Sequence, residues 1–155
     1  MTVFDIYKEL EDFLHPILDE MYFESPDGKR VKINIYKQSL PPKRDDEDMN
    51  PIPYLIIKVL GGTFPKDYRS DTAKIRVILL IAIMNTEEGY TASRDVIGVI
   101  ERIRQEFLKV GHLKTFSLCA DIDFTMNEED EYPYSFGGMD LKFRSIDVVR
   151  EDEYT

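Results

Sequence analysis

The sequence predicts one α+β domain in which a five-stranded, mostly antiparallel sheet carries two helices on one face, in the order α-β-β-β-α-β-β. Two observations support this prediction. Apolar residues recur every three or four positions over residues 2–22 and again over residues 94–110, which is the period of an amphipathic helix. Elsewhere, apolar and polar residues alternate or apolar residues form short runs, which is typical of strands. Helices interspersed among such strands indicate the α+β class.

The first half of the chain is expected to hold a helix, two strands and a long loop. Pro16 lies inside the helical pattern of residues 2–22 and should kink or split that helix. Residues 31–36 alternate as a half-buried strand. The Pro-rich loop Ser39–Pro53 follows, and then a second strand from Tyr54 that ends at a glycine pair.

The centre of the chain holds the clearest strand and the second helix. Ala73–Met84 begins with alternating residues and then becomes apolar on both faces, which indicates a central strand that is covered on both sides. The helix Arg94–Val110 follows. Ser93 is its expected N-cap, and Gly111 its expected C-cap.

Two further strands are expected near the C-terminus. Residues 116–126 alternate cleanly, which predicts one continuous strand with a single apolar face. Met139–Val148 forms the last strand. With 155 residues, the chain is expected to fold as one domain, residues 1–150, followed by a frayed acidic tail, residues 151–155.

Composition narrows the class of protein. The net charge of −10 disfavours binding to nucleic acids and anionic membranes, because such a surface repels phosphate groups. The single cysteine, Cys119, excludes an intrachain disulfide. The N-terminus resembles no signal peptide, and the longest apolar run, Val77–Met84, is far shorter than the roughly 20 residues that span a bilayer. We expect a soluble intracellular protein.

Possible catalytic groups are few. Asp121 and Asp123 are two positions apart on a predicted strand and would share a face, where paired carboxylates can hold Mg²⁺. A solvated strand face explains the same pattern and is preferred. Cys119 has no local motif linking it to His15 or His112, so a sheltered structural thiol is expected. The sequence contains neither a Walker A nor a dinucleotide-binding glycine motif.

Two kinds of residue are candidates for protein contacts. Basic residues gather at 29–32, at 43–44 and at 66–76, where they either form ordinary surface charge or dock an acidic neighbour such as another copy of the chain. In the stretch "EYPYSFGG", Tyr132, Tyr134 and Phe136 alternate before a glycine pair that should bend the chain. These aromatic residues should either seal the helix-covered face or pack against another subunit.

Seen whole, the chain resembles the tail terminators of long-tailed phages, of the lambda type. The resemblance rests on the order and length of the elements, on "IPYLIIKVLGG" followed by a loop and "KIRVILLIAIMNTE", on "SRDVIGVIERIRQEFL", and on "EYPYSFGGMDLKF". It covers nearly the whole chain.

The resemblance implies a structural protein without catalytic residues, metal or cofactor. Such proteins form a ring, here a hexamer, that ends polymerisation of the tail tube and presents a surface to the head connector or head-completion protein. Assembly takes place in the host cytoplasm, and the ring then belongs to the virion tail. The loops Gly61–Asp71 and Ser39–Pro53 become candidate contact sites. The candidate oligomer or tube interface comprises Lys43, Arg44, Phe64, Lys66, Tyr68, Arg69, Tyr132, Tyr134 and Phe136.

Two alternatives remain open on the sequence. One is a metal-dependent hydrolase that uses Asp121 and Asp123. The other is a small oligomeric α+β protein that binds an unknown ligand, for which a closed pocket of several hundred Å³ is expected.

Overall fold

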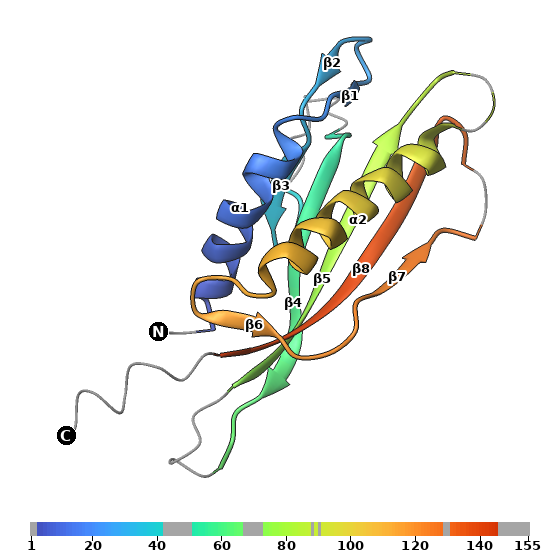
Figure 1. Ribbon diagram of the computed structural model, residues 1–155. Coiled ribbons are helices and arrows are strands. Elements are labelled where there is room, and N and C mark those ends of the chain that lie inside the picture. Colours follow the sequence, from blue (N-terminus) through green and yellow to red (C-terminus); the bar gives the residue numbers. More distant parts are fainter. Residues whose placement is uncertain are drawn as a thin grey trace.

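The computed structural model describes residues 3–41, 51–66, 73–87, 89, 91–128 and 131–145. Two helices lie side by side on one face of a twisted sheet, and a small separate hairpin stands at one end (Figure 1). The elements are α1 (Asp5–Leu18), β1 (Phe23–Glu24), β2 (Arg30–Val31), β3 (Asn34–Lys37), β4 (Tyr54–Thr63), β5 (Lys74–Met84), α2 (Thr91–Val110), β6 (Phe116–Leu118), β7 (Asp123–Met126) and β8 (Tyr134–Ser145).

The main sheet has six strands in the order β3-β4-β5-β8-β6, and β7 also pairs with β8. Only the β3–β4 pair is parallel; the other pairs are antiparallel. The α+β class, with both helices on one face, is therefore confirmed. The expected five strands were too few. Residues 116–126 form two strands of the main sheet rather than one, and the separate hairpin takes Val31 into β2 and adds β1, which was not predicted.

The core lies between the two helices and the sheet. In each of the three longest strands, alternate side chains point toward the helices; Ile57, Leu79 and Met139 form one such row and are fully buried. The helices contribute apolar stripes that pack onto these strands, which are Ile6, Leu10, Leu14, Ile17 and Leu18 from α1 and Val96, Val99, Ile100, Ile103 and Phe107 from α2. The stacked rings of Phe13 and Phe107 join the two helices.

Both helices differ from the prediction at their ends. α1 continues through Pro16 to Leu18 and is not split. Pro16 lies in the last turn, so few helical residues follow it and the loss of one backbone donor is tolerated. α2 begins at Thr91, which places Ser93 inside the first turn and not at the N-cap. Gly111 ends α2 as predicted: its φ of 78° is left-handed, and its N–H donates to the Phe107 carbonyl oxygen at 2.7 Å. Within the described residues, neither helix is long and apolar enough to cross a membrane.

The last strand begins earlier than predicted and shows no break at the glycine pair. β8 runs from Tyr134 to Ser145 and pairs with β5 continuously through Gly137 and Gly138. Gly137 is needed for the approach of α2, since a Cβ there would stand 2.6 Å from Cγ1 of Val96. The glycine pair therefore serves helix packing rather than a bend. Residues 146–155, which include the predicted end of this strand and the acidic tail, lie outside the described residues.

The predicted strand 116–126 is divided into β6 and β7, which pair with different parts of β8. The last backbone contact of this stretch with β8 is at Cys119, whose N–H donates to the Lys142 carbonyl oxygen at 2.9 Å. Beyond Cys119 the chain leaves the sheet until β7 begins. Cys119 is therefore exposed, and the expectation of a sheltered thiol was wrong. A regular alternation of apolar and polar residues predicts extended chain. It does not predict whether that segment pairs with one partner strand over its full length.

Candidate functional site

The face of the sheet opposite the helices is the most extensive candidate surface. In the part of the chain that the structure describes, no helix or strand lies over this face (Figure 1). It carries the other alternate side chains of β5, namely Arg76, Ile78, Leu80, Ala82 and Met84. We call it the open face.

Aromatic residues cover one end of the open face. Tyr134 and Phe136 of β8 pack against a small cluster of Ile52, Ala82 and Met84. Tyr54 belongs to the same group, and its ring meets that of Tyr36 edge to face at 6.5 Å. Burial raises the pKa of the Tyr54 phenol.

The three aromatic residues of "EYPYSFGG" are thus separated. Residues with odd numbers in this part of β8 face the helices, so Tyr134 and Phe136 point to the open face. They do not seal the helix-covered face, and that alternative was wrong. Tyr132 precedes β8 in a turn, outside the alternation, and its hydroxyl donates to the carbonyl oxygen of Thr86.

A shallow groove of about 400 Å³ runs along the open face over Gly138. Phe136, Gly138 and Asp140 follow one another on this face of β8. The groove exists because Gly138 has no side chain to fill the space between the other two. Ile78 and Leu80 form its apolar wall, and Leu80 is 37% exposed. An apolar side chain of a partner protein would fit such a groove better than a charged ligand.

One end of the groove is closed by an ion pair. Arg76 donates to the Asp140 carboxylate from Nε at 3.1 and 3.2 Å and from Nη2 at 2.7 Å. These hydrogen bonds hold the pKa of Asp140 below its usual value, and Lys142 adds to the effect through its charge. The same pair raises the pKa of Arg76. Both groups stay charged and satisfied at neutral pH, which suits a fixed surface feature better than proton transfer.

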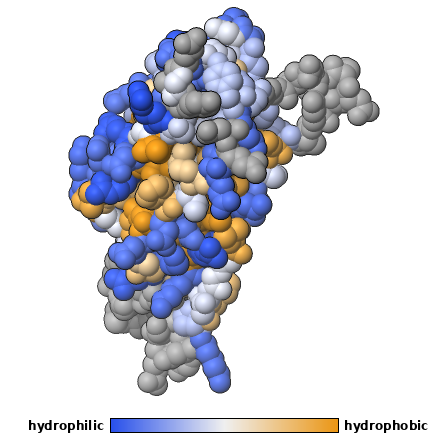
Figure 2. All heavy atoms as spheres, turned by 90° about the vertical axis from the view of Figure 1, so that its right-hand side faces the viewer, coloured by the Kyte–Doolittle hydropathy of each residue, from blue (hydrophilic) through white to orange (hydrophobic). Residues whose placement is uncertain are grey.

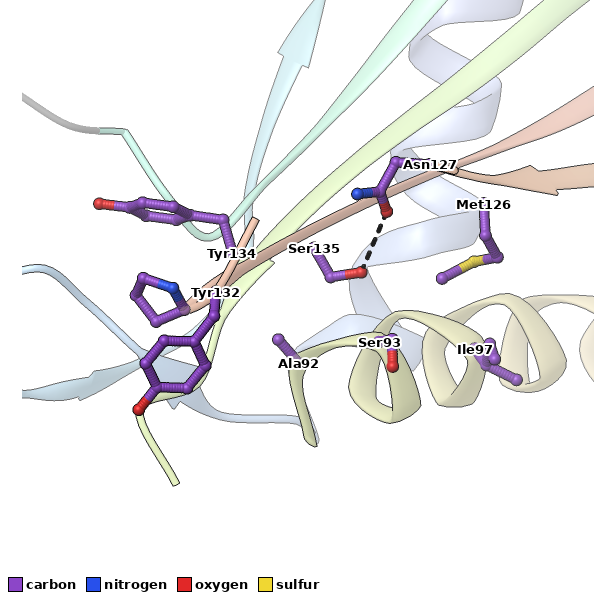
Figure 3. Close-up of a pocket in the computed structure, with 9 residues that line it drawn as sticks. Ala92, Ser93, Ile97, Met126, Asn127, Tyr132, Tyr134 and Ser135 are labelled. Carbon is purple, nitrogen blue, oxygen red and sulfur yellow. Dashed lines mark hydrogen bonds between the residues drawn. The ribbon is translucent and has the colours of Figure 1, made fainter. Parts of the chain in front are cut away.

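A smaller pocket of about 220 Å³ lies between the start of α2 and the link from β7 to β8 (Figure 3). Ser135 and Asn127 point toward one another there, and the Ser135 hydroxyl donates to Oδ1 of Asn127 at 3.4 Å. The same Oδ1 accepts from the backbone N–H of Phe136 at 3.2 Å. Ile97 and Met126 supply the apolar wall. The polar groups thus serve to fix the link between the strands.

The aspartates proposed for a metal site do not share a strand face. Asp121 precedes β7, and only Asp123 belongs to that strand, where its carboxylate lies 3.8 Å from Nζ of Lys142. Within the described residues, no group of three His, Cys, Asp or Glu side chains is placed to hold a metal ion.

The predicted interface residues are only partly described. Phe64 is 74% exposed just beyond β4, and Lys66 is exposed beside it. The far ends of β4 and β5 extend past both helices, so this apolar side chain lies at a protruding end of the molecule (Figure 1). Lys43, Arg44, Tyr68 and Arg69 lie outside the described residues.

A second apolar region, which the sequence reasoning missed, lies on the β7 side. Apolar residues gather across the middle of this side and are bordered by hydrophilic ones (Figure 2). Leu108 follows the apolar period of residues 94–110, which predicts a place on the buried stripe of α2, but it is 70% exposed, and Phe124 of β7 is 58% exposed. Leu108 borders a groove of about 450 Å³ between α2 and residues 118–122. The helical period of apolar residues does not show where the buried stripe ends. The sequence pattern therefore does not distinguish the exposed Leu108 from the buried Phe107.

Comparison with known proteins does not assign the chain to a family: no family model matches it, and no curated protein matches it.

Proposed function

We propose that this chain is a structural subunit that caps the tail tube of a long-tailed phage or prophage as an oligomeric ring, ends tail polymerisation and presents a surface for attachment of the head connector. The observation that carries the proposal is the open face. Both helices pack on the same side of the sheet, which leaves Leu80 exposed and Ile78, Tyr134 and Phe136 half-buried on the other side in the described structure. An apolar surface of this kind is typical of a protein that acts by contact with other proteins.

The geometry also favours contact at the protruding ends of β4 and β5. Leu60 and Phe64 are exposed there, and Lys66 and Lys74 place positive charge beside them. Aromatic residues are enriched at the centre of protein interfaces, and polar, solvent-accessible residues form the rim. We assign this end to contact with a neighbouring subunit or with the tube protein.

The partners follow from this assignment. They are further copies of the chain, with a hexamer as the proposed ring, together with the tail tube protein and the head connector or head-completion protein. The proposed location is the virion tail, after assembly in the host cytoplasm. No catalytic residue, metal ion or cofactor is part of the proposal.

The test is an assembly experiment with the purified protein and its tail tube protein. We expect electron microscopy to show rings, alone or at the ends of polymerised tubes, and addition of the protein to stop tube growth. A protein that remains monomeric in the presence of polymerised tubes, and leaves their length distribution unchanged, contradicts the proposal.

A matched pair of variants locates the contact. Phe64→Ser should weaken ring formation or tube capping, because burial of one phenylalanine side chain contributes about 1.5–3 kcal/mol. Phe4→Ser is the control, since Phe4 is 75% exposed on the helix side and thus loses the same side chain from a similarly exposed position. Equal effects of the two variants on capping would remove the β4–β5 end from the interface.

A further inference from the structure

In the described structure β3 forms one edge of the main sheet, and β6 and β7 follow one another along the opposite edge, beside β8. β3 pairs only with β4, and β7 pairs only with β8. The outward backbone N–H and C=O groups of such strands are a ready site for another strand. The two edges differ in direction, because β3 is parallel to β4 whereas β7 is antiparallel to β8 and so also to β3.

The two edges also carry opposite charge. Residues 29–38, which contain β3, include four basic and no acidic residues, which are Lys29, Arg30, Lys32 and Lys37. Residues 119–128, which contain β7, include three acidic and no basic residues, which are Asp121, Asp123 and Glu128. Lys37 is partly neutralised by Glu11 at 3.4 Å and Asp123 by Lys142 at 3.8 Å. The remaining charged side chains at both edges are exposed.

We infer that β3 of one copy pairs antiparallel with β7 of the next copy, head to tail, so that the sheet continues from subunit to subunit. This inference rests on the proposed function, since it names the contact that would build the ring. A head-to-tail contact joins two different surfaces, and it closes into a ring if the rotation between subunits permits. The opposite charges favour this arrangement over β3 meeting β3 or β7 meeting β7.

The side chains select a register for this pairing. Ile35 faces the helices together with its β4 neighbour Leu55, and Phe124 faces the helices together with Met139. Opposite residues in a sheet must point to the same face, which allows every second register. Among these we choose the register that places Ile35 opposite Phe124, because it brings basic residues of one edge beside acidic residues of the other. Lys32 then lies opposite Asn127, next to Glu128, and Lys37 lies next to the two aspartates. The contact also covers Phe124, which is 58% exposed in the single chain.

A cysteine cross-link tests this register. In a Cys119→Ser background, Ile35→Cys and Phe124→Cys are prepared as separate proteins, mixed and oxidised on assembled rings or capped tubes. Four strand steps of about 4.8 Å separate the two edges within one chain, about 19 Å in all. A disulfide requires Cα atoms within about 7 Å, so a 35–124 disulfide joins two chains.

We expect the mixture to give a covalent dimer whose linked peptides contain residues 35 and 124, several-fold above the amount formed by Ile35→Cys mixed with Gln105→Cys, a control at an exposed position of α2 that does not line the groove beside residues 118–122. Rings without this enrichment overturn the edge pairing and leave the ring intact as a proposal. Absence of rings and of tube capping overturns the proposed function itself.

A charge reversal gives a second readout that needs no cysteine. Lys29→Glu with Lys32→Glu should reduce ring formation, and addition of Asp121→Lys with Asp123→Lys in the same chain should restore it. The control, Lys109→Glu with Lys114→Glu, makes the same change in net charge outside residues 29–38 and 119–128. Equal loss in the control, or no rescue by the second pair, counts against charge matching at these edges. Circular dichroism of each variant separates loss of assembly from loss of folding.

Discussion

The two faces of one sheet have opposite surroundings although similar residues form them. Leu79 and Leu80 are neighbours on β5; the first is fully buried under the helices, and the second is 37% exposed on the open face. Both come from the same apolar run, which the sequence predicts as covered on both sides. The difference shows that an apolar strand face need not be covered by the chain that carries it. We assign the surface that covers the open face to another protein.

The largest expected effect comes from truncation of these two leucines. Leu79→Ala should lower the free energy of unfolding by about 2–5 kcal/mol, since it leaves a cavity beneath the helices. Leu80→Ala should cost less than about 1 kcal/mol in the single chain, because its side chain is already partly in water. Urea denaturation of both variants measures the contrast. Similar losses would mean that the open face is as well covered in the free chain as the helix face.

The glycine pair gives a second, smaller contrast. A Cβ at Gly137 meets Cγ1 of Val96 at 2.6 Å, so Gly137→Ala should destabilise by about 1–3 kcal/mol as α2 is pushed from the sheet. At Gly138 the nearest atom to an added Cβ is 3.5 Å away, which is ordinary contact. Gly138→Ala should therefore change stability by less than about 1 kcal/mol. Thermal unfolding of the two variants side by side measures the difference, and the reverse order would contradict the packing described.

The smallest expected effect concerns the ion pair on the open face. Arg76 lowers the pKa of Asp140, so the pair stabilises the fold when this carboxylate is ionised. Its contribution is fully present above the ordinary aspartate pKa of about 4 and disappears as the pH falls through the lower, folded value. Because Arg76 is largely exposed, Asp140→Asn should cost at most about 1 kcal/mol at pH 7.

Denaturation of the wild type and of Asp140→Asn between pH 7 and pH 2 checks the sign. The difference between the two proteins in free energy of unfolding should become smaller as the pH falls. A difference that grows as the pH falls would show that the pair acts in another way.

The sequence was sufficient to predict the elements that depend on the local pattern of apolar residues and on a capping glycine. Residues 73–84 and the strand from Tyr54 are strands close to their predicted bounds, and Gly111 ends α2. It was insufficient where a partner decides the outcome. The division of residues 116–126, the parallel pairing of β3 and the role of Gly137 all depend on which strand or helix lies alongside.

The candidate site divides in the same way. The aromatic residues of "EYPYSFGG" could be selected as contact residues from their composition, but the face of Tyr134 and Phe136 follows only from where β8 begins. The exposed Leu108 and Phe124 gave no signal in the sequence, because exposed and buried apolar residues follow the same period.

The pairing of β5 with β8 also has a consequence for how the chain is made. Lys74 pairs with Arg144, and Met84 with Tyr134, so the two central strands are 50 to 70 residues apart in the sequence. During synthesis, β5 leaves the ribosome long before its second neighbour exists. Until then its apolar side chains can meet β4 and the two helices, and the sheet closes only when β8 has emerged. The nascent protein must therefore carry one unpaired edge of this apolar strand until β8, 50 to 70 residues later, has been made.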